Sequence, residues 1–398
     1  MVYILYQHSN VKKKMRGFDK TEYSERVLKT QKLMEKKNLD ILLISSPQNF
    51  RYFTGLDSYF WESPTRPWFL LISQNNDPIA IVPSIGETAL KKTWIKNIKT
   101  WQSPNPEDEG ISTLTNEILC INKNHPTIGC ELGNENFLRI TINDFNKLKS
   151  NLLDCSFVDA SSIIWEMRMI KSNKEIDKIK KVVSIVSQAF DELQNYLNIG
   201  QSEIEITNIM KKKLIDLGSD HTLYMSCASG LGGYDQIICD PTEKKLTEGD
   251  ILVIDTGTTY DGYFCDFDRN FGFGKISDDV KKTYDILWEA LEVGMQSAKP
   301  GNTCADINNA MLKILKKSNS ETNNVGRMGH GLGLQLTEPP SIMSKDTTLL
   351  KENMIIAIEP AIEYSPGIML VHEENILITS KGFELLSSRT PKEIPIIK

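Results

Sequence analysis

Five residues in the second half of the chain carry side chains suited to binding divalent metals and to hydrolysis. They are Asp255, Asp266, His330, Glu359 and Glu373. Asp255 ends the apolar run ILVID and Glu359 ends the apolar run IIAIE, so both carboxylates belong to expected strands. Burying four carboxylates together is costly unless a cation neutralises them. The pattern therefore predicts a metal site.

Two segments of similar pattern are expected to position these carboxylates. Residues 248–271 and 351–379 each contain an acidic residue, an apolar strand ending in a carboxylate, a turn, and a second strand with another carboxylate. Paired strands of a hairpin lie about 5 Å apart, so both carboxylates of each segment can face one point. The repetition suggests an internal duplication of a hairpin.

His330 lies between the two hairpins in the glycine-rich stretch GRMGHGLGLQLTEPP, residues 326–340. Glycines permit close approach of the backbone and unusual dihedral angles. One imidazole with four carboxylates is a mostly hard donor set, suited to manganese, cobalt, iron or zinc and large enough for two bridged ions. Each feature alone is ordinary, because such residues commonly form turns and loops. Their combination favours the metal site.

The first part of the chain alternates between helical and strand-like patterns. The spacing of apolar residues predicts a helix over 21–37 and strands over 40–45, 67–73 and 78–83. Similar alternation continues to about residue 165. This alternation predicts an α/β domain.

The second part opens with a long amphipathic helix and then becomes rich in strands. The expected helices cover 174–197, 202–217, 278–297 and 304–317. We place the boundary between two domains near residue 170, giving a first domain of 1–169 and a second of 170–398.

Composition excludes several classes of function. The 398 residues carry a net charge of −6, so a nucleic-acid partner is not expected. No apolar run reaches the roughly 18 residues of a membrane span, and no cleaved signal is expected. The 7 cysteines form an odd set without a C-x-x-C pair, which suits a reducing compartment. We therefore expect a cytoplasmic protein.

The order of the five candidate ligands resembles the pita-bread metallopeptidases. This superfamily includes Xaa-Pro dipeptidase (prolidase), aminopeptidase P and methionine aminopeptidase, with creatinase as a metal-free relative. The matching motifs are His330 in G-H-G, Glu359 in I-E-P and Glu373 ahead of N-I-L-I-T, and NFRYFTGL at 49–56 looks like the N-terminal domain signature. The resemblance implies a creatinase-like α/β N-terminal domain followed by an α+β pita-bread C-terminal domain.

The resemblance also implies an activity. The five residues would bind two divalent metal ions, manganese first, and a hydroxide bridging the ions would attack an amide carbon. Glu359 and His330 would be catalytic, with Glu359 handling the proton of the water. The simplest substrate is an Xaa-Pro dipeptide, and relatives suggest a homodimer.

Departures from the family pattern concern substrate binding. Two histidines that are usual in the peptidases are replaced by Ile238 and Thr337, and the prolidase-type R-I-E reads V-H-E, with Val371 and His372. His372 either takes over the role of the arginine or is a strand residue facing away, which the alternation of side chains favours. Asp268 shares the face of Asp266 and either supports the cluster or pairs near Arg269; these two alternatives are even.

Further substrate-binding candidates lie outside the metal motifs. In relatives, the region around residues 59–72 reaches the active site of the partner subunit, so Trp61 and Arg66 are expected to bind substrate across a homodimer. Arg66 would suit a carboxylate. Tyr234, Thr337 and His372 complete the expected substrate-binding set, with Tyr234 a candidate to replace a lost polar group.

Three functions follow from these observations. The first is a dinuclear metallohydrolase of the Xaa-Pro peptidase type. The second keeps the fold and metals but acts on a non-peptide solute, as ectoine hydrolase or a dimethylsulfoniopropionate lyase does, and is favoured by Ile238 and Thr337. The third is a non-catalytic binding protein, disfavoured because every metal ligand of the pattern is present.

Overall fold

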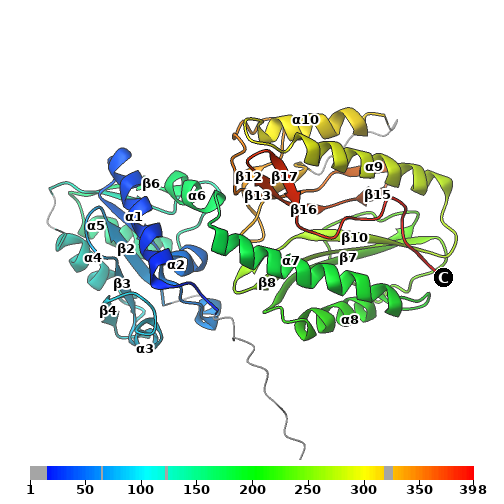
Figure 1. Cartoon of the computed structure of the whole chain (residues 1–398). Coiled ribbons are helices and arrows are strands. Elements are labelled where there is room, and N and C mark those ends of the chain that lie inside the picture. The colour runs from blue at the N-terminus through cyan, green and yellow to red at the C-terminus, as the bar shows by residue number, and fades with distance from the viewer. Residues whose placement is uncertain (1–15, 64–65, 122–123, 318–325) are drawn as a thin grey trace, which may run out of the picture.

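The computed structural model describes residues 16–63, 66–121, 124–317 and 326–398. The chain forms two lobes, and helix α7 (Asn173–Leu193) begins where they meet and runs along the second lobe (Figure 1). The described helices include none that is both long enough and apolar enough to cross a membrane.

The N-terminal lobe is built on a mixed six-stranded sheet of order β4-β3-β2-β1-β5-β6. Its strands are β1 (Ile41–Ile44), β2 (Phe69–Ser73), β3 (Ile79–Pro83), β4 (Asn97–Trp101), β5 (Thr127–Cys130) and β6 (Ser156–Asp159). The helices are α1 (Lys20–Lys36), α2 (Pro47–Thr54), α3 (Glu87–Leu90), α4 (Ile111–Leu119), α5 (Ile142–Asn151) and α6 (Ser161–Met169), with 3₁₀ turns η1 (Tyr59–Glu62) and η2 (Ser84–Gly86). Alternate residues of β1 enter two different apolar cores, so helices cover both faces of the sheet. The expected α/β architecture is confirmed.

The C-terminal lobe places its strands between two pairs of helices (Figure 1). Helices α7 and α8 (Glu203–Asp216) lie on one side, and α9 (Asp278–Ser297) and α10 (Cys304–Leu315) on the other. A 3₁₀ turn, η3 (Gln194–Tyr196), follows α7. Both α7 and α8 begin at a serine whose side chain and a glutamate three residues later cap each other's backbone, which explains where the helices start.

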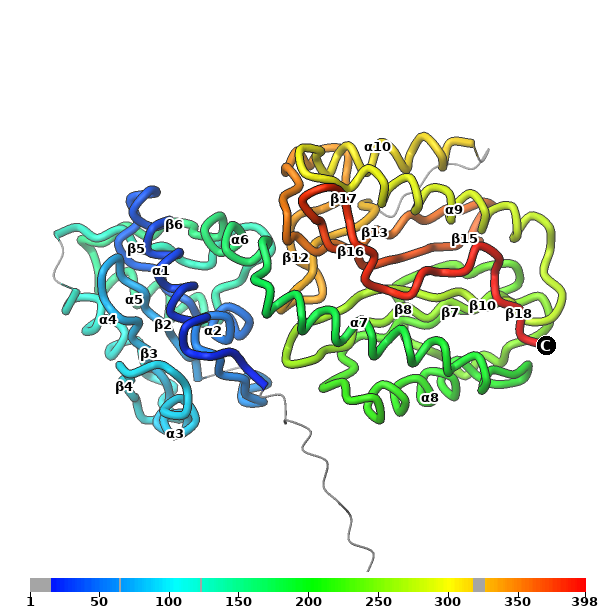
Figure 2. Tube along the Cα trace, in the orientation of Figure 1, coloured from blue at the N-terminus to red at the C-terminus, as the bar shows by residue number. Residues whose placement is uncertain are grey.

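Two principal sheets make up the strand layer. The first has the order β18-β10-β8-β7, with β9 paired to β8, and the second has the order β12-β11-β13-β16-β17. Strand β18, at the end of the chain, pairs with β10 at the end of the lobe remote from the N-terminal lobe (Figure 2). The strands are β7 (Thr222–Leu231), β8 (Asp250–Tyr260), β9 (Tyr263–Phe264), β10 (Phe267–Phe273), β11 (Gly329–Gly331), β12 (Glu338–Ser341), β13 (Ile355–Ile358), β14 (Ala361–Ser365), β15 (Ile368–Val371), β16 (Glu374–Thr379), β17 (Gly382–Leu385) and β18 (Ile396–Ile397).

The two expected hairpins are present, but their pairing differs from a simple hairpin. In the first, β8 runs antiparallel to β10, and the residue opposite Asp255 is Asp268 rather than Asp266. In the second, β13 pairs with β16, while β14 and β15 form a separate two-stranded sheet. Pro360, which has no backbone N–H to donate to a sheet, lies where β13 gives way to β14.

Buried ion pairs join the two lobes. Arg168 of α6 and Lys171 both contact Glu338 of β12, and the Lys171 Nζ to Glu338 Oε2 distance is 3.5 Å. Arg168 also donates to Asn49 of α2 at 2.7 Å. All three charged residues are buried. Since an isolated buried carboxylate is costly, Glu338 fixes the approach of the lobes.

Removing one cation from this group should destabilise the protein. Arg168→Met leaves Glu338 buried with Lys171 alone, and we expect the free energy of unfolding to fall by about 3–5 kcal/mol. Urea denaturation measures the change. The matched control is Lys180→Met, which breaks the exposed Lys180–Glu384 pair and should change stability little. Equal effects of the two substitutions would contradict this role of Arg168.

Candidate metal centre

Three of the five expected ligands meet in one cluster. Ligand atoms of Asp266, His330 and Glu373 all lie within 4.8 Å of one another. The Nε2 atom of His330 is 3.4 Å from Asp266 Oδ2 and 3.9 Å from Glu359 Oε1. These residues come from distant parts of the chain: Asp266 precedes β10, His330 lies in β11, Glu359 follows β13 and Glu373 precedes β16.

The backbone orients the imidazole of His330. Its Nδ1 lies 2.9 Å from the carbonyl oxygen of Gly331. Because a carbonyl only accepts, Nδ1 carries a hydrogen, and this contact leaves Nε2 facing Asp266 and Glu359. Gly329 permits this placement, since its φ is +142° and a Cβ there would lie 2.3 Å from the carbonyl oxygen of Ala357.

Asp255, on β8 of the hairpin that also carries Asp266, lies beside this group. The hydroxyl of Tyr224 donates to its Oδ2 at 3.0 Å. Burial, followed by the charge of Asp266, raises the pKa of Asp255 to about 8. Burial raises the pKa of Asp266 to about 7 and that of Glu359 to about 7, and it also raises the pKa of Glu373. The site thus resists holding all of its negative charges at once.

The unsatisfied oxygen atoms of the cluster fit a bound cation. Among the described residues, Asp255 Oδ1, Asp266 Oδ1 and Glu373 Oε1 are buried without a hydrogen-bond partner. Buried polar atoms are normally paired, so an unpaired set at one point calls for a ligand. Carboxylate oxygens with one imidazole nitrogen are donors that divalent metals accept. The residues present therefore fit a metal.

Each of the two hairpins holds a ligand of the other by a side-chain hydrogen bond to the backbone of that ligand. The side chain of Asn375 accepts from the backbone N–H of Asp266 at 3.0 Å and donates to its carbonyl oxygen. In turn, the side chain of Asp268 accepts from the backbone N–H of Glu373 at 3.1 Å. Each residue two positions beyond a ligand thus holds the backbone of the ligand on the other hairpin, and this contact shows Asp268 supporting the cluster.

Sequence reasoning missed Arg327 beside the cluster. Its Nη2 donates to Thr337 Oγ1 at 3.3 Å and its Nη1 to Ser341 Oγ at 3.4 Å, while Nε lies 4.0 Å from Glu359 Oε1. Its position three residues before His330 in the glycine-rich motif was the available signal. Thr337 therefore lies at the cluster with its hydroxyl engaged by Arg327, whereas Ile238 is 77% exposed.

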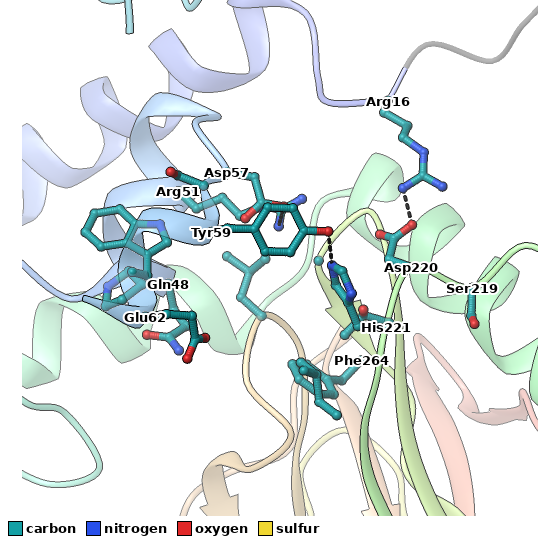
Figure 3. Close-up of a pocket in the computed structure, with 17 residues that line it drawn as sticks. Arg16, Gln48, Arg51, Asp57, Tyr59, Glu62, Ser219, Asp220, His221 and Phe264 are labelled. Atoms are coloured by element: carbon teal, nitrogen blue, oxygen red, sulfur yellow. Dashed lines mark hydrogen bonds and ion pairs between the residues drawn. The ribbon is translucent and has the colours of Figure 1, made fainter. Parts of the chain in front are cut away.

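A cleft of about 710 Å³ opens between the lobes (Figure 3). Tyr59 from the N-terminal lobe points across it to His221 from the other lobe, with 3.4 Å between the tyrosine oxygen and Nε2. Phe264 and Leu334 also line it, and Phe264 lies two residues before Asp266. The cleft thus adjoins the segments that carry the ligands.

The two expected substrate residues of the N-terminal lobe, Trp61 and Arg66, have different environments. Trp61 lines the cleft and packs against Phe50 and Trp68, with ring centroids 5.5 and 5.2 Å away. Arg66 is not among the residues that line the cleft. Its backbone N–H donates to Glu109 at 2.6 Å and its guanidinium lies over the ring of Phe60.

Tyr234 and His372 have interior positions. The hydroxyl of Tyr234 donates to Asn270 and accepts from the backbone N–H of Val371, so it has no free donor for a substrate. The ring of His372 is fully buried and meets the ring of Tyr284 edge-on at 4.3 Å. Burial lowers the pKa of His372 to about 3. His372 lies between β15 and β16 rather than in a strand, and its buried, neutral ring agrees with an interior side chain rather than with replacement of an arginine.

Comparisons with known families cover most of the chain. Residues 177–380 match metallopeptidase family M24, and residues 26–170 match the creatinase/prolidase N-terminal domain. An uncharacterised peptidase of Staphylococcus aureus is 28% identical over 371 residues, which cover 90% of this chain and 98% of the relative.

Two further relatives are named for a substrate class. The Xaa-Pro dipeptidase of Pyrococcus furiosus is 26% identical over 373 residues, covering 93% of this chain and 99% of the relative. The crystal structure of a prolidase from Thermococcus sibiricus superimposes with a TM-score of 0.84 at 26% identity, covering 94% of this chain and 99% of that chain.

The metal-free protein should lose stability as pH rises. The folded pKa of Asp255 and of Asp266 lie above the usual values, so between about pH 4 and pH 8 the native state holds more protons than the unfolded state. The free energy of unfolding should then fall by up to about 1.4 kcal/mol per pH unit for each retained proton. Thermal unfolding in a chelator measures the slope. Asp255→Asn removes one of the coupled charges and should flatten it, and an unchanged slope would contradict the assignment.

Removing the brace should weaken metal binding. In Asn375→Ala the backbone of Asp266 loses both side-chain hydrogen bonds, and we expect affinity for Mn²⁺ to fall about 10- to 100-fold. Calorimetric titration measures the affinity. Asn308→Ala, at a buried asparagine of α10, is the matched control and should bind Mn²⁺ as the unsubstituted protein does. Equal affinities of all three proteins would show that the brace is dispensable.

Proposed function

Because the chain belongs to metallopeptidase family M24, we propose that it is an Xaa-Pro dipeptidase that depends on divalent metal. The observation that carries the proposal is the meeting of Asp266, His330 and Glu373, with Glu359 beside them. The relatives named as Xaa-Pro dipeptidase and prolidase supply the substrate class.

Asp255, Asp266, His330, Glu359 and Glu373 would hold the metal, and two manganese ions are the proposed complement. A divalent metal bound there polarises a carbonyl oxygen and makes water acidic near neutral pH. The protein contributes fixed donor positions, because His330 is held by its own backbone and Asp266 by Asn375.

Glu359 is the proposed proton carrier. Its side chain is 22% exposed, compared with 6% for Asp266, so substrate and water can reach it from outside the cluster. A carboxylate that borders the metal and is open to solvent is suited to accept a proton. It would take the proton of the attacking water and deliver it to the leaving nitrogen as the amide bond breaks.

Substrate recognition remains part of the proposal. Trp61 provides an aromatic surface in the cleft, and we retain the hypothesis that Trp61 and Arg66 act across a homodimer. Sedimentation of the purified protein tests that hypothesis, because a monomer would leave no partner subunit for these residues to reach.

One observation favours a second candidate function. Thr337 takes the place of a peptidase histidine, and His330 is the one histidine of the metal cluster found among the described residues. A site without the additional imidazoles could act on a small non-peptide solute with an amide or sulfonio group. The substrate panel below distinguishes the two functions.

The test is release of proline from a panel of Xaa-Pro dipeptides by protein reconstituted with Mn²⁺. Unsubstituted protein should release proline, and His330→Ala should lose metal binding and at least 100-fold of the rate, on the order of other losses of a group central to catalysis. His125→Ala, at an exposed histidine of the N-terminal lobe, is the matched control and should behave as the unsubstituted protein.

Two results would count against the dipeptidase. Proline release by fully metal-stripped protein would contradict the proposed dependence on a divalent metal. If the protein binds Mn²⁺ but releases no proline from any dipeptide, the second candidate function, with a non-peptide solute as substrate, is favoured.

A further inference from the structure

Arg327 is the one arginine or lysine, within the part of the chain that is described, whose side chain lies within 4.0 Å of a carboxylate of the metal cluster. It stands at the mouth of the site, since its side chain is 29% exposed while that of His330 is 4% exposed. A positive charge at this position lies beside the cluster and is also accessible from solvent.

The guanidinium is only lightly held by the protein. It has five N–H donors, and its two hydrogen bonds to Thr337 and Ser341 are 3.3 and 3.4 Å long, at the weak end of the range. The contact with Glu359 is longer still, at 4.0 Å. Donors therefore remain for an anionic group that enters the site.

The arginine of the family's R-I-E pattern is absent from this chain. Val371 stands at that position and is 5% exposed within an apolar core cluster. The neighbouring His372 is fully buried, with its ring packed edge-on against that of Tyr284. Neither residue offers a positive charge to the free carboxylate of a dipeptide.

We propose that Arg327 binds the free carboxylate of the substrate and restricts the enzyme to substrates that end one residue after the scissile bond. This inference rests on the proposed dipeptidase function and deepens it. Guanidinium and carboxylate form paired N–H···O bonds, which give orientation as well as affinity. An extended peptide has a neutral amide at the same place and offers no such partner.

The experiment compares Ala-Pro with its neutral amide, Ala-Pro-NH₂, using Mn²⁺-reconstituted protein. Unsubstituted protein should cleave Ala-Pro with a kcat/KM at least 10-fold higher. Arg327→Gln should lose this preference through a 10- to 100-fold higher KM for Ala-Pro, with cleavage of the amide changed less than about 3-fold. Arg327→Lys, which keeps the charge without the planar fork, should recover part of the preference.

The control variant is Lys345→Gln, which removes an exposed positive charge from the loop after β12. It should leave both substrates unaffected. Arg327 would be a donor at the reaction centre instead if Arg327→Gln lowered kcat equally for acid and amide, and that result would overturn the proposal. Equal cleavage of acid and amide by unsubstituted protein would also overturn it.

A binding measurement keeps the inference separate from the proposed function. Should neither peptide be cleaved by the unsubstituted protein, the dipeptidase proposal fails, and calorimetric titration with L-proline and L-prolinamide tests Arg327 alone. Binding of proline over prolinamide that disappears in Arg327→Gln supports carboxylate recognition. Equal affinity of the unsubstituted protein for the two compounds, or a preference unchanged in Arg327→Gln, refutes it.

Discussion

The cost of holding several carboxylates together inside a protein shapes the whole C-terminal lobe. Burial raises the pKa values of Asp255, Asp266 and Glu373, and the charges of neighbouring carboxylates raise those of Asp255 and Glu373 further. Each also has a buried oxygen atom without a hydrogen-bond partner among the described residues. A fold that keeps such a group is stabilised by the cation that neutralises it, so metal binding and folding are energetically linked.

The two hairpins also hold each other by side-chain hydrogen bonds to the backbone. Asp266 and Glu373 lie just before β10 and β16, where the regular ladder has not begun. Asn375 and Asp268 supply the missing hydrogen bonds to their backbones. The duplicated hairpin thus does two things at once, because each copy offers ligands and each copy fixes the ligands of the other.

Local sequence patterns predicted the elements but not the contacts between them. The helix expected over 21–37 is α1, and the apolar runs in the first lobe became β1, β2 and β3, since periodicity and turn residues act locally. The first hairpin places Asp268, not Asp266, opposite Asp255. The tight turn between Tyr260 and Tyr263 fixes this register along β8, β9 and β10, and sequence spacing alone did not locate that turn.

Where the role of a residue depends on tertiary packing, the sequence both missed functional residues and suggested residues that have another role. Arg327 and Asn375 went unnoticed because their partners are brought close only by the meeting of separate strands. Tyr234 was expected at the substrate, but its hydroxyl is engaged by Asn270 and Val371 inside the lobe. Polar residue type suggests chemistry, and only the fold decides whether the polar atom is free.

The replacement of an imidazole by Thr337, whose hydroxyl contacts Arg327, alters what this site can do. A histidine changes charge near neutral pH and serves as a donor or an acceptor, whereas a guanidinium is a permanent cation that only donates. Thr337 with Arg327 therefore supplies a constant positive charge beside Glu359 and no additional proton carrier. Proton transfer then falls to the carboxylates of the cluster, and the charge at position 327 is left to recognise an anion.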